Sequence, residues 1–254
     1  ADNFRNELVW RRTNAKGLAF TRFASNHDII LRYSKSEKST WNPQYSEHNP
    51  EYLEKFYRFI EPETGRRYQL GDLVNPNQNR PNLTYEFLGI TRVWRWTKER
   101  MQEAHSKGIV VQTKPSSVPR LKRYLDEQEG NAVDDVWCDI PPVQAQAAER
   151  LGYGTQKPLA LLERIVLASS NEGDIVLDPF CGCGTAVAVA QKRNRKWIGI
   201  DVTWLAINLI EERLKHTFGQ EIIKTFEVRG NPTDEVAAEA LARKNKKEFE
   251  VWAI

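Results

Sequence analysis

Cysteine and histidine are scarce in this chain of 254 residues, and their scarcity excludes two classes of protein. The three cysteines, Cys138, Cys181 and Cys183, are too few for a disulfide framework. Cys181 and Cys183 are close enough to suggest a metal, but a second cysteine or histidine pair is missing nearby, because the four histidines are scattered at positions 27, 48, 105 and 216. We therefore expect no metal site.

Long apolar runs are missing as well. No stretch of about 18 apolar residues occurs, although a membrane-spanning helix needs one of that length. No charged-then-apolar leader precedes the first predicted strand either. We therefore expect a cytoplasmic protein without a membrane partner.

A strong excess of one charge is absent too, because 37 basic and 34 acidic residues leave a net charge of only +3. This charge is too small to indicate a nucleic-acid partner by itself. With 40% hydrophobic residues, the chain can bury one sizeable core together with an appended smaller domain.

The sequence does contain a chemically specific stretch around Asp178. Residues 174–178 predict a short buried strand, the pair Gly182 and Gly184 predicts a tight turn, and residues 185–192 predict an Ala/Val-rich helix. Glycines at such a turn let the backbone approach a ligand, and the start of the helix offers free N–H groups. This strand, turn and helix form the first half of a nucleotide-binding unit.

A second predicted strand, residues 197–201, ends in Asp201, which lies 23 positions after Asp178. This is close to the roughly 20-residue spacing at which an acid meets a ribose hydroxyl, so a nucleoside-containing cofactor is predicted. Tight packing without any ligand is an alternative, since a lone Gly-x-Gly also occurs there. NAD is disfavoured because Val187 stands where a dinucleotide site needs its third glycine, and the turn opens with Asp-Pro-Phe.

Three motifs together resemble one known family. They are Asp178-Pro-Phe-Cys-Gly-Cys-Gly-Thr185, the preceding Gly154-Thr-Gln-Lys-Pro158 and the following Trp197-Ile-Gly-Ile-Asp201. They resemble the S-adenosylmethionine site of bacterial site-specific DNA methyltransferases that modify adenine N6 or cytosine N4, in the permuted order that places the cofactor half last. Segments 3–10, 27–35 and 135–142 are similar to the family too, so the resemblance covers most of the chain.

The resemblance implies an α/β fold: a partial Rossmann-like doubly wound sheet of the S-adenosylmethionine-dependent methyltransferase type, with an inserted target-recognition region. Asp201 would accept hydrogen bonds from the ribose hydroxyls, and Asn231, after a third strand at 221–228, would contact adenine. Pro158 suits the first turn of a helix over 159–169. The implied cofactor-binding residues are Thr155, Lys157, Pro158, Asp178, Phe180, Gly182, Gly184, Thr185 and Asp201.

Four segments are predicted along the chain. Residues 1–35 form a hairpin of the methyltransferase sheet, and 36–130 form the inserted DNA-binding region. Residues 131–231 form the cofactor-binding half and begin with a linker. Residues 232–254 are a C-terminal tail with a helix over 236–247.

Positive charge is concentrated between Arg92 and Arg123, where nine cations face two acids for a net charge of +7. Such a patch would place basic side chains on DNA phosphates. An alternative is a two-faced strand, in which Trp94 and Trp96 are buried and alternate with wet arginines. The predicted DNA-binding residues are Arg92, Arg95, Lys98, Arg100, Arg120, Lys122 and Arg123.

The family's catalytic motif, Asp, Asn or Ser followed by Pro-Pro and an aromatic residue, does not occur in the sequence. Ile140-Pro-Pro-Val143 has the prolines between apolar residues, and Asn42-Pro43 has a single proline. That motif frees and aims the amine of a flipped base, so we assign no catalytic residue. Two parallel strands are also missing, which would leave the first cofactor strand with an unpaired edge. We therefore expect an N-terminally truncated enzyme, inactive alone.

The intact protein is predicted to transfer a methyl group from S-adenosylmethionine to an exocyclic amino group of a flipped base in double-stranded DNA. Adenine N6 is preferred over cytosine N4 because similar sequences are usually adenine-specific. The missing motif would come from an N-terminal segment or a second polypeptide, and a cognate restriction endonuclease is a further candidate partner. Alternatives are a subunit of a split methyltransferase, a non-catalytic DNA-binding or cofactor-sensing module, and methylation of RNA or a small molecule.

Overall fold

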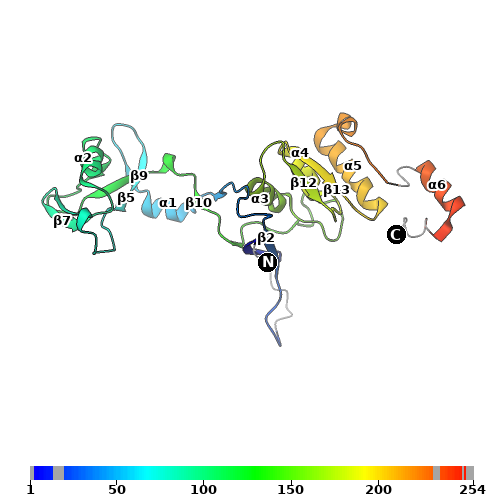
Figure 1. Ribbon diagram of the computed structural model, residues 1–254, viewed down its shortest axis with the longest axis horizontal. Coiled ribbons are helices and arrows are strands. Elements are labelled where there is room, and N and C mark those ends of the chain that lie inside the picture. Colours follow the sequence, from blue (N-terminus) through cyan, green and yellow to red (C-terminus); the bar gives the residue numbers. More distant parts are fainter. Residues whose placement is uncertain (1–2, 14–19, 231–234, 248, 250–254) are drawn as a thin grey trace. The chain divides into compact units, whose positions relative to one another are not determined.

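The computed structural model describes residues 3–13, 20–230, 235–247 and 249 (Figure 1). The chain divides into two compact units, one formed by residues 1–44 with 133–254 and the other by residues 45–132. Residues 36–44, which the sequence predicts as the start of the insert, belong to the first unit. There the amide side chain of Asn42 donates to the carbonyl oxygens of Leu167 and Ser170, at 2.9 and 3.0 Å.

The first unit begins with the predicted hairpin. Strands β1 (Phe4–Arg11) and β2 (His27–Tyr33) pair antiparallel, so the hairpin prediction is confirmed. Strand β11 (Val136–Trp137) pairs in parallel with β1 on its other edge, so the segment predicted as a linker supplies a strand. Trp10 and Trp137 pack with Ile140 and Leu161 into a buried cluster that joins this sheet to helix α3 (Leu159–Ser169).

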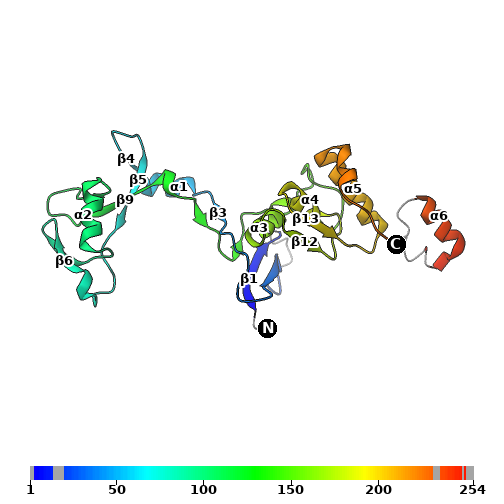
Figure 2. The same ribbon diagram turned by 45° about the horizontal axis from the view of Figure 1, so that its top comes forward.

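The cofactor half follows as a strand, helix, strand and helix. Strands β12 (Ile175–Asp178) and β13 (Lys196–Gly199) pair in parallel, linked by α4 (Thr185–Lys192), and α5 (Trp204–Phe218) follows β13 (Figure 2). The helices predicted over 159–169 and 185–192 are confirmed at both ends. Helix and sheet approach closely, because a Cβ added at Gly199 would lie 2.9 Å from Cγ2 of Val187.

The third strand predicted over 221–228 is wrong. Gly219, at φ +89°, ends α5, and residues Gln220–Thr225 form the short 3₁₀ helix η3, which buries Ile222 in the same cluster as Leu214 of α5. The chain then extends to Phe226, whose ring packs against Trp197 with centroids 5.3 Å apart. Packing against α5 and β13 therefore replaces strand pairing. Asn231 lies outside the described residues.

One face of the β12–β13 pair carries exposed apolar side chains. Helix α4 contacts both strands on the other face. Alternate residues Ile175 and Leu177 are 64% and 57% exposed, and Ile198 and Ile200 are exposed beside them. In the described part of the chain, β12 pairs with β13 alone. Parallel sheets are normally covered on both faces, whereas this face is exposed in the described part of the chain.

Helix α6 (Glu235–Lys244) matches the helix predicted in the C-terminal tail. Within the described residues, no helix combines the length and apolarity needed to cross a membrane.

The second unit is built from short strands. Its sheet has the order β4-β5-β9-β8, a hairpin is formed by β6 and β7, and β3 pairs with β10 where the chain enters and leaves. The elements are β3 (Tyr45–Ser46), α1 (Pro50–Phe56), β4 (Phe59–Ile60), β5 (Arg67–Asp72), η1 (Pro81–Leu83), β6 (Thr84–Phe87), β7 (Ile90–Val93), α2 (Lys98–Ser106), β8 (Val110–Val111), β9 (Arg120–Tyr124), η2 (Leu125–Glu127) and β10 (Asn131–Ala132).

Trp94 is the centre of the second unit's core. It is fully buried and packs with Leu73, Phe87 and Met101. Its indole N–H donates to the carbonyl oxygen of Tyr85 at 2.8 Å, which satisfies the polar atom of this large side chain. The neighbouring Arg95 is exposed, but β7 ends at Val93 and Trp96 is only partly buried, so the predicted two-faced strand does not continue through Trp96.

Candidate cofactor site and nucleic-acid interface

The loop between β12 and α4 is shaped by two glycines. Gly182 and Gly184 have φ values of +51° and +70°, which other residues adopt only with strain. A Cβ at Gly184 would lie 2.5 Å from Cγ1 of Ile210, so the backbone packs directly on α5. Gly184 precedes Thr185 as the N-cap of α4. The turn therefore presents the N-terminus of α4 beside the end of β12, the arrangement that binds anionic or nucleotide groups.

Asp201 holds the same turn from the end of the second strand. Its Oδ2 accepts from the Gly182 N–H at 2.9 Å, and its Oδ1 accepts from the Thr203 N–H and hydroxyl, both at 3.0 Å. Burial raises the pKa of the Asp201 carboxyl, but the hydrogen bonds from Thr203 and Gly182 outweigh it and hold the pKa below its ordinary value. The structure thus brings together Asp201 and Gly182, and Asp201 is ionised there at neutral pH.

A cavity of about 810 Å³ opens beside Asp201. Its lining includes the apolar residues Ile200, Val202 and Phe226 and also the charged residues Lys196, Glu227 and Arg229. Ligand sites in proteins have volumes of roughly 300 to 1,000 Å³, so this cavity has the size for an aromatic base. Phe180, on the preceding turn, is 88% exposed.

The segment 155–158 reaches the start of α4. The Thr185 hydroxyl donates to the Lys157 carbonyl oxygen at 3.3 Å, which joins two of the motifs found in the sequence. The Lys157 ammonium pairs with Asp28 of β2 at 3.2 Å, whereas Thr155 is exposed. Gln156 is not among the predicted cofactor-binding residues. Its side-chain amide fixes the segment, because it donates to the Glu149 carbonyl oxygen and accepts from the Leu151 N–H.

The sequence predicts Pro158 in the first turn of α3, but the structure places it just before that turn. Pro158 is the extended N-cap residue of the helix, with ψ 144°. The first helical N–H, that of Leu159, donates to the Glu149 carboxylate at 2.8 Å. A proline before that residue is compatible with this cap because the helix needs no N–H from it.

Arg213 of α5 is a buried cation below the turn, and the sequence analysis did not select it. It is 5% exposed, and its Nη1 donates to the Cys183 carbonyl oxygen at 3.0 Å and to the Thr185 hydroxyl at 3.1 Å. Burial lowers the pKa of its guanidinium. Its Nη2 is buried without a hydrogen-bond partner among the described residues. An unpaired buried donor is costly, and the negative charge of Glu149 offsets part of the cost of burying this guanidinium.

The predicted DNA-binding cations fall into two groups in the second unit. Arg92, Arg95, Lys98 and Arg100 are exposed and have no ion pair in the described part of the chain, and the Arg100 guanidinium stacks on the Trp96 ring at 4.1 Å. Arg120 and Lys122 of β9, in contrast, pair with Asp72 and Glu61. Arg123, which has no described ion pair, lies against Gly71 of the neighbouring strand.

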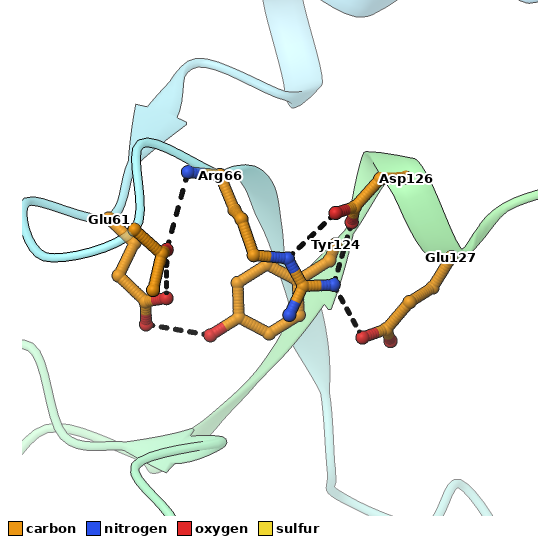
Figure 3. Close-up of polar contacts among 6 residues, drawn as sticks. Glu61, Arg66, Tyr124, Asp126 and Glu127 are labelled. Atoms are coloured by element: carbon orange, nitrogen blue, oxygen red, sulfur yellow. Dashed lines mark hydrogen bonds and ion pairs between the residues drawn. The ribbon is translucent and has the colours of Figure 1, made fainter.

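Lys122 is held inside a network that Figure 3 shows in part. Glu61 accepts from the Lys122 ammonium at 2.8 Å and from the Tyr124 hydroxyl at 2.7 Å, and the Lys122 side chain is 14% exposed. Arg66 stacks over the Tyr124 ring and pairs with Asp126 and Glu127. Lys122 is therefore neutralised by its own fold, which argues against its predicted phosphate contact.

Comparison with known proteins assigns the chain. Residues 2–212 match the profile of the DNA methylase family N6_N4_Mtase. The chain belongs to this family. The chain is 31% identical over 218 residues to the type II methyltransferase M.EcaI of Enterobacter cloacae, a match that covers 84% of the chain and 47% of the relative. It is 47% identical over 93 residues to the DNA adenine methyltransferase YhdJ of Escherichia coli K12, covering 35% and 31%.

The chain spans less than half the length of these two curated relatives. Among solved structures, it is similar to TTHA0409 of Thermus thermophilus complexed with S-adenosyl-L-methionine, at 18% identity and a TM-score of 0.38, over 84% of this chain and 54% of that one. Its α/β fold is that of the family, and the matched residues include every predicted cofactor-binding position.

The Glu61 network gives the second unit a defined response to acid. The hydrogen bonds from Lys122, Thr64 and Tyr124 lower the pKa of Glu61 from 4.5 to about 2. Because this folded-state pKa lies below the ordinary value, the stabilisation is fully present above about pH 4.5 and is lost as the pH falls toward 2. We expect Glu61→Gln to flatten the loss of thermal stability over that window.

Thermal melts from pH 5 to pH 2 followed by tryptophan fluorescence measure this effect. Glu86→Gln, at an exposed position of β6, is the matched control and should leave the wild-type profile unchanged. An identical acid profile for Glu61→Gln and wild type would remove the stabilising role of the network.

Proposed function

We propose that this chain provides the cofactor-binding half and the target-recognition unit of an S-adenosylmethionine-dependent DNA methyltransferase. The observation that carries the proposal is the convergence on one turn of three segments distant in sequence. Gly182 is bonded to Asp201 of the second strand's end, and Thr185 is bonded to the Lys157 carbonyl. Membership of the DNA methylase family supports the same assignment.

The residues present fit S-adenosylmethionine in three ways. The cavity beside Asp201 has the size for adenine, and the ribose hydroxyls would replace a hydrogen bond that the Asp201 carboxylate now accepts from Thr203. The N-terminus of α4 and the unsatisfied Nη2 of Arg213 suit the methionine carboxylate. S-adenosylmethionine, when bound, supplies an electrophilic methyl group. The chain's own residues bind and orient it.

The acceptor we propose is the exocyclic amino group of a base flipped out of double-stranded DNA, with adenine N6 preferred over cytosine N4. The likeness to the DNA adenine methyltransferase YhdJ favours adenine. A flipped base must be held and its amine aimed at the methyl group. Because the sequence contains no Asp/Asn/Ser-Pro-Pro-aromatic motif, we assign that task to residues outside these 254.

The exposed apolar face of β12–β13 supports this division of labour. Ile175, Leu177 and Ile198 would be covered if further strands and helices completed the sheet. These could come from the same polypeptide or from a second one, as in a split methyltransferase. We further propose a cytoplasmic site of action and, from the likeness to M.EcaI, a cognate restriction endonuclease as partner.

Asp201→Ala tests the assignment of the cofactor site. We expect the affinity for S-adenosylmethionine to fall by about 1 to 3 kcal/mol, because charge-assisted hydrogen bonds to the ribose and the anchor of Gly182 are both lost. Calorimetric titration measures the affinity. The control is Asp174→Ala, which removes a carboxylate that also caps a backbone N–H, that of Asn171, just before β12. Equal affinity in the two variants would refute the ribose assignment.

A further inference from the structure

A short polar loop lies at the end of the β6–β7 hairpin in the second unit. This amide loop, Asn75-Pro-Asn-Gln-Asn-Arg80, consists of three asparagines, a glutamine, a proline and an arginine. Both of its ends are fixed to the same two residues. The Asn75 N–H donates to the Val93 carbonyl oxygen at 2.7 Å, Val74 bridges to Trp94, and Thr84, after the loop, pairs with Val93. Both ends of the loop are therefore anchored beside the buried Trp94.

The loop is also ordered from within. Asn75 Oδ1 accepts from the Asn77 N–H, and Asn77 Oδ1 accepts from the Asn79 N–H, both at 3.0 Å, while Gln78 Nε2 donates to the Asn75 carbonyl oxygen at 2.8 Å. These turns place the side chains of Asn79 and Arg80 at the surface. Neither side chain has a hydrogen bond or ion pair in the described part of the structure. A preorganised loop loses little conformational entropy on binding.

Uncompensated cations flank the loop. Arg95 follows Trp94 directly, and its Nε donates to the Val74 carbonyl oxygen at 3.1 Å, so its side chain lies along the start of the loop. Arg92 pairs across the hairpin with Tyr85, next to Thr84, where the chain enters β6 after the loop and η1. Both arginines are exposed and lack an acidic partner among the described residues, in contrast to Arg120 and Lys122 on β9.

We propose that the amide loop reads base edges of duplex DNA, through Asn79 and Arg80, while Arg92 and Arg95 hold the adjoining phosphates. The inference deepens the proposed function and rests on it. An asparagine amide matches the paired donor and acceptor of adenine in the major groove, and an arginine matches the two acceptors of guanine. Phosphate contacts fix the register of a protein on DNA, whereas base contacts carry its sequence preference.

The arrangement favours duplex DNA over RNA. A rigid loop projecting both an amide and a guanidinium needs an open groove, and the major groove of A-form RNA is too deep and narrow for side chains to read. Recognition of unstacked bases in single-stranded RNA relies on exposed aromatic rings, and the amide loop contains none.

The experiment compares sequence selection with salt dependence in the full chain. Wild type and variants are bound to a pool of DNA duplexes with a randomised centre, and the bound fraction is sequenced; affinity for a selected duplex is then titrated at several salt concentrations. Asn79→Ala combined with Arg80→Ala should reduce discrimination by roughly 5- to 150-fold at the affected base pairs. Its salt slope should stay within one phosphate contact of wild type.

Arg92→Ala with Arg95→Ala should do the opposite, lowering affinity for all sequences and reducing the salt slope by about 2 while the selected sequence stays the same. Gln128→Ala with Lys55→Ala, which removes an exposed amide and an exposed cation on other elements, is the control and should behave as wild type.

Three results would overturn the inference in distinguishable ways. If the loop variant selects the same sequence as strongly as wild type, the loop is not the reader, and the proposed function stands. If a duplex RNA of the selected sequence competes equally with the DNA, recognition is not through the major groove. If wild type binds no duplex at all, both the inference and the proposed DNA-binding role fail.

Discussion

Replacing Gly184 by alanine should abolish detectable binding of S-adenosylmethionine and destabilise the chain by about 2 to 4 kcal/mol. Two effects add. The left-handed backbone at φ +70° costs any residue with a side chain about 1 kcal/mol, and the new Cβ would lie 2.5 Å from the buried Ile210. Relief of that clash must move the N-cap of α4 away from the position that the cofactor site needs. Denaturant titration and calorimetry measure the two losses.

Gly173→Ala is the matched control. Gly173 has a similar φ of +83°, but a Cβ there would meet nothing within 4 Å. We expect a loss of only about 1 kcal/mol and unchanged cofactor affinity. The difference between the two variants isolates the close packing of the turn on α5. Equal stability losses in Gly184→Ala and Gly173→Ala would mean that the turn accommodates a Cβ at Gly184 without a clash with Ile210.

Replacing Arg213 by methionine should weaken S-adenosylmethionine by about 2 to 3 kcal/mol, roughly 30- to 150-fold, if its buried Nη2 bonds to the methionine carboxylate. Folding should suffer too, because the Cys183 carbonyl oxygen loses its donor, although methionine has a similar length and the change removes an unsatisfied buried donor. Arg213 also ties Cys183 and Thr185 together, so some loss of affinity from a looser turn is expected for any ligand.

Decarboxylated S-adenosylmethionine separates these two contributions, because it differs from the cofactor only in the missing carboxylate. Wild type should prefer the complete cofactor strongly, and Arg213→Met should lose most of that preference. If the variant weakens both molecules by the same factor, Arg213 positions the turn and does not contact the carboxylate. Calorimetric titration of S-adenosylmethionine and of its decarboxylated form into wild type and into Arg213→Met gives the four affinities of this double-mutant-type cycle.

The elements around the cofactor site could be predicted from sequence because their signals are local. The apolar run before Asp178, the two glycines and the Ala/Val run after Thr185 specify a strand, a turn and a helix without reference to the rest of the chain. The spacing to Asp201 then brings the carboxylate to the same edge, since parallel strands end on one side of a sheet.

The structural features that the sequence did not predict depend on tertiary packing. The β-prone residues of 221–228 predict a strand, yet Gly219 turns the chain so that Ile222 packs on α5, and this burial outweighs local propensity. Arg213 has the sequence signature of an exposed helical cation, since it precedes Lys215 and follows two glutamates. Its burial follows from the approach of α5 to the turn at Cys183, 30 positions away.

The net charge of a sequence segment does not show which of its cations form ion pairs in the fold, and the second unit provides an example. Lys122 and Glu61 are 61 positions apart, so a local count of cations assigns Lys122 to the basic patch although its partner lies on a distant strand end. Arg92 and Arg95 have no such partner among the described residues, and the same count places them correctly on the surface. Net charge of a segment therefore overestimates the charge that a ligand meets.

We propose that this chain holds a cofactor site for S-adenosylmethionine but not the residues that perform methyl transfer. Calorimetric titration of the purified chain with S-adenosylmethionine, together with transfer of a tritiated methyl group to mixed-sequence DNA by the same preparation, tests it directly. The account predicts stoichiometric binding without transfer. Failure to bind would contradict the assignment of the turn at Gly182, Gly184 and Asp201, and transfer would contradict the assignment of catalysis to residues outside the chain.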